Sequence, residues 1–420
     1  MVLKAVKNKY LFWVFILCFI LVLLGISVSE TKIAIQDNAL DIKTGADRVE
    51  LYIDKLKNKN IALVANQSSI INFADKKRLG SNQKLHQHLV DFLYNYKNIF
   101  VKKVFAPEHG FRGKADAGET VKDRVDALTG IPIISLYGRN KKPLPKQLRG
   151  IDILVFDIQD VGVRFYTYIS TLHYVMEACA ELGIKVLILD RPNPNAHYID
   201  GPILEPKHQS FVGMHPVPVV YGMTIGEYAK MINGQKWLKN GIQCNLTVIP
   251  ILNYQHKAQY PLPVKPSPNL PNAVSVNLYP SLGFFEGTHI SVGRGTDKPF
   301  QIVGSPFYKL KKYNYYFTPL PNNGAKNPKH NGKTCYGYNL SYEPSLKQLE
   351  LKWLVDFYQT YTEHHPKEKP FFNSFFTKLA GTENLQQQIE KGFTISQIRA
   401  SWKKDLGIFK EIRKKYLLYK

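Results

Sequence analysis

The chain has 420 residues, of which 44% are hydrophobic and 21% charged, the balance of a globular protein with room for two or three domains. Its mean hydropathy of -0.23 excludes a polytopic membrane protein. Lysine and arginine number 56 against 33 for aspartate and glutamate, and the formal charge of +23 indicates an anionic partner such as nucleic acid, a membrane or a wall polymer.

The N-terminal residues have the pattern of an export signal. Three lysines precede an uninterrupted apolar run from Tyr10 to Ile26, and the small residues Ser27 and Ser29 follow it. Residues 1–29 are therefore expected to be a signal peptide or, alternatively, an uncleaved anchor, since the run is close to the shortest that spans a bilayer. Either way we expect an exported protein of the periplasm or cell envelope. Nucleic acid is then not its natural partner, and any membrane association would run through this segment.

Further along the chain, short apolar runs alternate with helix-length amphipathic stretches, as is typical of an α/β fold with a parallel sheet. The most continuously aliphatic runs are those of strands buried on both faces of such a sheet. We expect a Rossmann-like, mostly parallel sheet domain over residues 45–240. This pattern of strands and helices does not by itself imply a bound cofactor. Its predicted strands are Ile61–Ala65, Val101–Ala106, Ile133–Leu136, Ile151–Asp157 and Lys185–Asp190, and its clearest helix is Thr167–Leu182.

The composition changes near residue 240. A proline-rich connector from Tyr260 to Pro271 is followed by mixed strand and turn signals up to about Tyr342. Helical periodicity then covers Ser345–Thr362 and Ile395–Leu418. These features predict a second, smaller α+β domain over residues 241–420, which would complete a cleft with the first.

Polar clusters follow several predicted strands, at the carboxyl edge where open α/β sheets bind ligands. A glycine-rich dinucleotide fingerprint follows none of them, so no nicotinamide cofactor is expected. The sharpest cluster contains Glu108, between Pro107 and His109. A carboxyl group in such a half-apolar turn has its protonated form favoured, which is the property that a general acid needs. Alternatively, Glu108 caps a helix or pairs with Arg112.

His109 is the second candidate in this turn. It could shuttle a proton or ligate a metal, but a single histidine beside a turn more often orients a neighbour through a hydrogen bond. No His-Glu-x-x-His motif or comparable cluster accompanies it, so no metal site is expected.

Two further clusters have residue types that bind sugars. After Asp157, the residues Asp160, Arg164 and Tyr166 could form a shelf on which a pyranose stacks, although Asp160 and Arg164 could instead pair with each other. A similar group follows the next strand: Asp190, Arg191 and Asn193. Arg191 could bind a ligand carboxylate through two hydrogen bonds.

A second carboxylate, Glu286, lies between an aromatic pair and a glycine, and Arg294 follows it between Gly293 and Gly295. These glycines do not form a phosphate-binding loop, because the Gly-Lys-Ser/Thr ending is missing. Two carboxylates from separate segments with aromatic neighbours fit glycoside hydrolysis better, since one protonates the leaving oxygen while the other stabilises or activates from the opposite side.

Taken together, four motifs make this chain resemble the exo-β-N-acetylmuramidase family, the NamZ-type glycoside hydrolases formerly classed as a domain of unknown function. The resemblance covers roughly residue 45 to the C-terminus. The motifs are Phe-Ala-Pro-Glu-His-Gly at 105–110, Asp-Ile-Gln-Asp-Val-Gly at 157–162, Leu-Asp-Arg-Pro-Asn-Pro at 189–194, and Phe-Glu-Gly-Thr followed by Ser-Val-Gly-Arg-Gly-Thr within 285–296.

The resemblance implies an active site between a Rossmann-like domain and a smaller one. It also implies release of N-acetylmuramic acid from the non-reducing end of peptidoglycan fragments without a cofactor, with Glu108 matching the catalytic glutamate. Because muramic acid bears a lactyl carboxylate, a selective site needs a cation, and Arg164, Arg191 and Arg294 are the candidates. Two alternatives stay open: a non-catalytic peptidoglycan-binding protein and a metal-dependent phosphoesterase.

Overall fold

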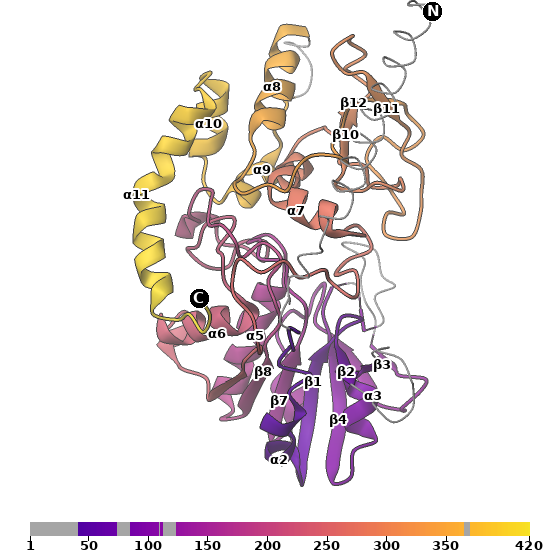
Figure 1. The fold of residues 1–420 in the computed structure, drawn as a ribbon, viewed down its shortest axis with the longest axis vertical. Coiled ribbons are helices and arrows are strands. Elements are labelled where there is room, and N and C mark those ends of the chain that lie inside the picture. Colours follow the sequence, from indigo (N-terminus) through magenta and orange to yellow (C-terminus); the bar gives the residue numbers. More distant parts are fainter. Residues whose placement is uncertain (1–40, 74–84, 109, 112–122, 365–369) are drawn as a thin grey trace, which may run out of the picture. The chain divides into compact units, whose positions relative to one another are not determined.

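The computed structural model describes residues 41–73, 85–108, 110–111, 123–364 and 370–420, and a seven-stranded sheet is its largest element (Figure 1). The strand order is β5-β6-β4-β1-β7-β8-β9, and every neighbouring pair is parallel except β5 with β6. The expected mostly parallel α/β sheet is confirmed. The strands are β1 (Lys59–Ala65), β4 (Ile99–Ala106), β5 (Arg124–Val125), β6 (Pro132–Ser135), β7 (Ile153–Asp157), β8 (Lys185–Leu189) and β9 (Leu246–Ile249).

Both faces of this sheet are buried, because successive side chains of a strand point to opposite faces. In β1, Ala62 and Val64 join the core that contains α5 (Tyr168–Glu181) and α6 (Ile225–Gly234). Ile61 and Leu63 join the opposite core, with α2 (Ile53–Leu56) and α3 (Leu89–Tyr94). All four side chains are fully buried. The continuous aliphatic runs of the sequence follow from this double burial.

The C-terminal part forms a smaller antiparallel sheet with several helices, as expected for an α+β region. The sheet has the order β10-β12-β11, from β10 (Ile302–Ser305), β11 (Tyr315–Phe317) and β12 (Cys335–Asn339). The helices are α7 (Ala273–Leu282), η4 (Gly283–Gly287), α8 (Lys352–His364), α9 (Ser374–Ala380), α10 (Asn384–Glu390) and α11 (Ile395–Lys414). The main sheet takes its last strand, β9, from beyond residue 240, and the predicted domain boundary at that position stays a prediction.

Shorter elements complete the described part of the chain. A two-stranded antiparallel sheet pairs β2 (Ile70–Phe73) with β3 (Leu85–His88). The remaining helical turns are η1 (Val49–Leu51), α4 (Pro145–Leu148), η2 (Pro206–His208) and η3 (Lys239–Gly241).

The helix predicted over Ser345–Thr362 begins later, at Lys352. The preceding backbone N–H groups donate to side chains instead of to helical carbonyls: Leu346 to Asn277 at 2.7 Å and Leu349 to Asp200 at 2.8 Å. Because these distant side chains satisfy the backbone, a segment without regular secondary structure replaces the first predicted turns.

The C-terminal helix α11 runs from α10 to α6 (Figure 1). The residues that follow it are anchored to the main sheet and to α6. The backbone N–H of Leu418 donates to Glu227 at 2.8 Å, and the Tyr419 hydroxyl donates to Asp190 at 2.6 Å. The end of the chain is therefore tied to the strand that precedes the Asp190 motif.

The predicted signal or anchor segment, residues 1–29, lies outside the described residues. Within the part of the chain that the structure does describe, no helix combines the length and apolar character needed to cross a membrane. Cys179, Cys244 and Cys335 are free thiols and buried, as expected for apolar core side chains.

Candidate active site

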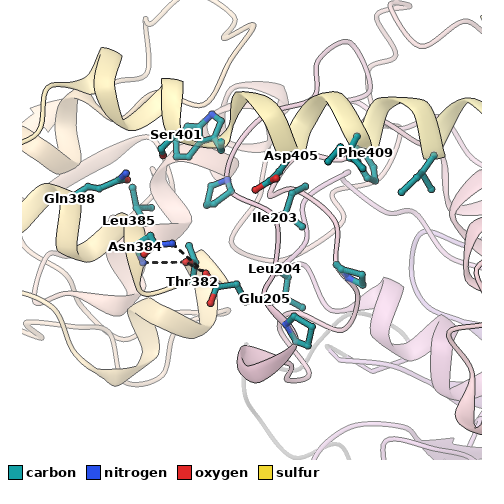
Figure 2. A pocket seen from close by; sticks show the side chains of 16 residues that line it. Ile203, Leu204, Glu205, Thr382, Asn384, Leu385, Gln388, Ser401, Asp405 and Phe409 are labelled. Atoms are coloured by element: carbon teal, nitrogen blue, oxygen red, sulfur yellow. Dashed lines mark hydrogen bonds between the residues drawn. The ribbon is translucent and has the colours of Figure 1, made fainter.

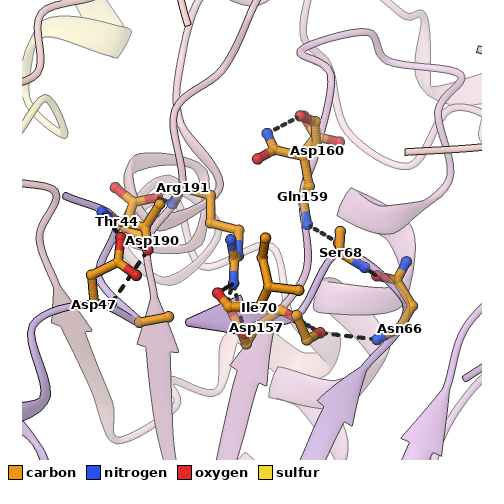
Figure 3. A network of polar contacts seen from close by, with 12 residues as sticks. Thr44, Asp47, Asn66, Ser68, Ile70, Asp157, Gln159, Asp160, Asp190 and Arg191 are labelled. Atoms are coloured by element: carbon orange, nitrogen blue, oxygen red, sulfur yellow. Dashed lines mark hydrogen bonds and ion pairs between the residues drawn. The ribbon is translucent and has the colours of Figure 1, made fainter. Parts of the chain in front are cut away.

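The polar clusters that follow β7 and β8 meet at the carboxyl edge of the main sheet (Figure 3). Their centre is a buried ion pair: Nε and Nη2 of Arg191 donate to the two carboxylate oxygens of Asp157 at 2.6 and 2.9 Å. Nη2 also donates to the Ile70 carbonyl at 2.8 Å. Burial by itself would lower the pKa of Arg191, but the charge and hydrogen bonds of the nearby Asp157 carboxylate together have the larger effect. The pKa of Arg191 is therefore raised above its usual value. Arg191 has 3% of its surface exposed, and its predicted role in binding a ligand carboxylate stays a prediction.

The predicted substrate-binding residues Asp190 and Asn193 are also structural. Asp190 is fully buried and accepts hydrogen bonds from the Gly226 N–H and from the hydroxyls of Thr224 and Tyr419. Burial raises the pKa of Asp190 to about 7. Asn193 is buried, and its Nδ2 donates to the Met223 carbonyl at 2.7 Å. Both side chains hold loops together, and their predicted contact with substrate stays a prediction.

Arg164 also has a structural position, and its predicted role in substrate binding stays a prediction. Its side chain is fully buried, and burial lowers its pKa to about 9. It does not pair with Asp160; Nη1 and Nη2 instead donate to four backbone carbonyls. These belong to Pro202 at 2.8 Å, Val217 at 2.7 Å, Leu379 at 2.9 Å and Ala380 at 2.6 Å. Arg164 thereby joins the end of α9 to the segment that follows β8.

Asp160 and Tyr166 lie in a cluster of buried tyrosines rather than on an exposed shelf. Asp160 accepts hydrogen bonds from the Tyr221 hydroxyl and from the Gly162 N–H, and burial raises its pKa to about 6. Its Oδ1 has no hydrogen-bond partner among the described residues. Tyr166 is only 7% exposed, and its hydroxyl donates to the Pro266 carbonyl at 2.8 Å. A ring buried to this extent offers no face on which a sugar could stack.

Glu108 occupies the turn after β4, where it is half-buried. Its Oε2 accepts a hydrogen bond from Thr167 Oγ1 at 2.8 Å, immediately before α5. The Tyr137 hydroxyl also hydrogen-bonds to Glu108, and burial together with this carboxylate raises the pKa of Tyr137. Gly110, with a φ of 73°, closes the turn by donating to the Pro107 carbonyl at 3.0 Å. Strand, turn and helix therefore orient the Glu108 carboxyl.

Tyr137 and Thr167 are contacts of Glu108 that the sequence analysis missed. Tyr137 follows β6, so the rule of searching at strand ends could have found it. Thr167 was assigned only as the start of a helix. The other two candidates in this turn, His109 and Arg112, lie outside the described residues.

Glu286 lies in η4 and is paired with Arg294. Nε and Nη2 of Arg294 lie 2.9 and 2.8 Å from Glu286 Oε1, and the guanidinium stands over the Phe300 ring at 5.0 Å. The side chains of Arg294 and Glu286 are 22% and 25% exposed. Unlike Arg164 and Arg191, Arg294 thus keeps a surface that a ligand can reach.

Lys329 supports this segment and was also missed. Its Nζ donates to three backbone carbonyls around Glu286, those of Phe285, Thr288 and Ile290. Burial lowers the pKa of Lys329 to about 8. No sequence signal distinguishes this lysine from the many others in the C-terminal part.

The Gly-Phe-Phe-Glu-Gly motif is required for close packing. A Cβ on Gly283 would lie 2.4 Å from the Phe165 ring, and one on Gly287 would lie 2.4 Å from the Phe376 backbone. The glycines therefore allow η4, which contains Glu286, to approach both α9 and the segment after β7.

The charges of both Glu108 and Glu286 act on Tyr279. This buried tyrosine packs edge-to-face on Tyr166, with ring centroids 5.9 Å apart. Its pKa is raised well above the usual value, first by burial and then by the charges of Glu286 and Glu108, with Arg294 acting in the opposite direction. The surroundings of Tyr279 are thus the neighbourhood to which both candidate carboxylates contribute charge.

Two cavities lie outside this neighbourhood. One of about 380 Å³ separates α11 from residues 202–206 and is lined by Leu204, Trp402 and Phe409 among others (Figure 2). A larger one, of about 690 Å³, follows the proline-rich connector. Neither is lined by Glu108 or Glu286. Within the described ranges, no group of three or more histidine, cysteine, aspartate or glutamate side chains is arranged to hold a metal ion.

Comparisons with known proteins cover nearly the whole chain. Residues 61–274 and 277–419 match family models described as the N-terminal and C-terminal parts of exo-beta-N-acetylmuramidase NamZ. A curated relative, peptidoglycan beta-N-acetylmuramidase NamZ of Bacillus subtilis strain 168, is 40% identical over 394 residues, which are 90% of this chain and 91% of the relative. Two solved structures of DUF1343 family proteins from Bacteroides fragilis superpose with TM-scores of 0.79 and 0.74, at 44% and 27% identity. Each comparison covers 90% of this chain and 99% of the other.

Proposed function

We infer the function of this chain from its family, because it belongs to the exo-β-N-acetylmuramidase NamZ family. It is a glycoside hydrolase, an exo-acting β-N-acetylmuramidase of peptidoglycan. The observation that carries this conclusion is the family match over both halves of the chain. In detail, we propose that it releases N-acetylmuramic acid from the non-reducing ends of peptidoglycan fragments, during cell-wall turnover and recycling.

We propose Glu108 as the general acid of this reaction. Its half-buried carboxyl is oriented by Thr167 and Tyr137, and it donates its proton to the glycosidic oxygen as the bond to the leaving sugar breaks. Glu286 is the carboxylate that stabilises the developing positive charge or activates water. Its salt bridge with Arg294 and the support from Lys329 fix its position.

Recognition of the lactyl carboxylate is assigned to Arg294. A selective site for muramic acid needs a cation that the substrate can reach. Arg164 and Arg191 are 0% and 3% exposed, while the Arg294 side chain is 22% exposed. Of the three arginines, Arg294 is therefore the one whose side chain a substrate carboxylate can approach.

The substitution Glu108→Gln tests the catalytic assignment. Because the amide cannot donate the required proton, turnover of a chromogenic muramide is expected to fall by a factor of about 10² to 10⁴ with an unchanged unfolding curve. Glu411→Gln on the exposed face of α11 serves as the control and should keep full activity. Turnover close to that of the unchanged protein would reject Glu108 as the acid.

The same assay separates the two alternative functions. A non-catalytic peptidoglycan-binding protein would bind muramic-acid oligomers without releasing reducing sugar. A metal-dependent phosphoesterase would lose its activity on a phosphate ester when treated with a chelator. We expect instead release of reducing sugar that a chelator does not change.

We also propose that residues 1–29 direct export, which would bring the enzyme to its peptidoglycan substrate. The basic stretch followed by an apolar run and small residues supports this, as does the net charge of +23, which favours an anionic glycan. N-terminal sequencing of the protein from fractionated cells tests it. A mature N-terminus close to Glu30 in the periplasmic or wall fraction is expected. An intact N-terminus in the membrane fraction would indicate an anchor, and protein confined to the cytoplasm would reject export.

A further inference from the structure

The larger cavity is an unassigned feature beside the candidate active site. It has a volume of about 690 Å³ and lies between the proline-rich connector, the start of α7 and residues 343–347. Its floor includes the apolar side chains of Leu262, Leu270 and Val274. A cavity of this size accommodates a short peptide or a drug-sized ligand.

The rim of the cavity is positively charged. Three exposed lysines line it: Lys257, Lys265 and Lys347. None of the three forms an ion pair with a described residue. The acidic residue of the lining, Glu343, lies 3.5 Å from Lys352, which is not among the lining residues. The cavity therefore presents three uncompensated ammonium groups above an apolar floor.

The wall of the cavity is in direct contact with the candidate active site. Gln67 Nε2 donates to the carbonyls of Lys265 and Pro266 at 3.3 and 3.0 Å, and the Tyr166 hydroxyl donates to the Pro266 carbonyl at 2.8 Å. Tyr166 directly precedes Thr167, whose hydroxyl donates to Glu108 Oε2 at 2.8 Å. The cavity wall and the Glu108 carboxyl are therefore joined through two successive residues, and a ligand that extends from Glu108 along this segment approaches the cavity.

We propose that the cavity binds an acidic peptide carried by the substrate. This proposal rests on the proposed function. Peptidoglycan alternates N-acetylmuramic acid with N-acetylglucosamine, so the next muramic acid is the second sugar beyond the bond that is cleaved. Arg294 takes the free lactyl carboxylate of the terminal sugar, and the peptide on that next muramic acid enters the cavity. Its carboxylates pair with the three lysines, while its apolar side chains pack on the floor.

The test compares two trisaccharides, N-acetylmuramic acid–N-acetylglucosamine–N-acetylmuramic acid, with and without an acidic peptide on the last sugar. For the unchanged enzyme we expect a KM about five to twenty times lower for the peptide-bearing trisaccharide. This preference should decrease as salt screens the charges, and it should be lost when the peptide carboxylates are amidated.

The triple substitution Lys257→Gln, Lys265→Gln and Lys347→Gln should remove the preference and leave kcat and KM for the peptide-free trisaccharide unchanged. A control with the same net charge replaces three exposed lysines by glutamine: Lys391, which directly follows α10, and Lys403 and Lys410 in α11. None of the three lines the cavity. This control should keep the full preference.

The outcomes separate the two proposals. If neither trisaccharide is hydrolysed, the proposed function itself fails. If both are hydrolysed with equal KM, or if the preference survives the triple substitution, the peptide site is rejected while the hydrolase activity stands. Binding of inorganic polyphosphate is measured as a second probe of the lysines. If the triple substitution abolishes polyphosphate binding but leaves the peptide preference intact, the lysines bind an anion other than the peptide, and the peptide site is rejected.

Discussion

At Arg191, the cost of removing a guanidinium from water is offset by its two hydrogen bonds to Asp157 and one to a carbonyl. Arg164 satisfies the same requirement with four carbonyls. Arg294 has the same side chain but stays partly exposed. At this scale burial, and not the residue type, separates the two arginines whose guanidinium groups are enclosed by the fold from the one that solvent reaches.

This distinction predicts the effect of Arg191→Met. The substitution leaves the Asp157 carboxylate buried without a partner, so the free energy of unfolding should fall by about 3 to 5 kcal/mol. Urea denaturation followed by circular dichroism measures it. Arg139→Met, at an exposed position, should change stability by less than about 0.5 kcal/mol. A stable Arg191→Met protein with a raised KM would show that Arg191 contacts substrate after all.

At the scale of elements, η4 depends on contacts from distant segments. Gly283 and Gly287 allow it to approach Phe165 and α9 closely, and Lys329 holds the carbonyls of Phe285, Thr288 and Ile290. A helical turn this short has little stability of its own, so tertiary contacts maintain the position of Glu286.

We therefore expect Lys329→Met to lower kcat about tenfold, with a smaller change in KM, because the carbonyls lose their shared donor and Glu286 shifts. Steady-state kinetics on a chromogenic muramide provides the measurement. Lys333→Met, an exposed lysine in the same turn, is the matched control and should behave as the unchanged enzyme. If both variants show equal kcat, Lys329 has no positioning role.

At the scale of the whole molecule, buried acids link distant parts of the chain. Asp190 joins β8 to α6 and to the C-terminal Tyr419, and burial raises its pKa to about 7. Between about pH 4 and pH 7 the folded state therefore keeps a proton that the unfolded state has released. Stability from this group must fall as the pH rises through that window, because ionisation of the buried carboxyl is penalised only in the folded state.

The substitution Asp190→Asn should remove this dependence, since the amide resembles the neutral acid and does not titrate. The decrease in unfolding free energy between pH 4 and pH 8 should be smaller in the variant, by up to about 4 kcal/mol. Denaturant titrations of both proteins at several pH values give the difference. Parallel curves for the two proteins would contradict a raised pKa at Asp190.

Much of the fold and part of the candidate site could be predicted from local patterns. The aliphatic runs of β1, β7 and β8 identified a parallel sheet buried on both faces, and the rule for strand ends identified the turn that contains Glu108. The same rule selected Asp160, Asp190 and Arg191, and it could not tell a buried partner from an exposed ligand-binding group.

The sequence by itself determined the family and the sheet-forming segments along the chain, and it predicted that Glu108 follows a strand, because periodicity and strand-end motifs are properties of neighbouring residues. Only the tertiary structure decided which polar groups are already paired. Arg164 binds carbonyls of residues 379 and 380, Glu108 is oriented by Tyr137, and Glu286 is supported by Lys329. These partners are far apart along the chain, and only folding brings them within hydrogen-bonding distance.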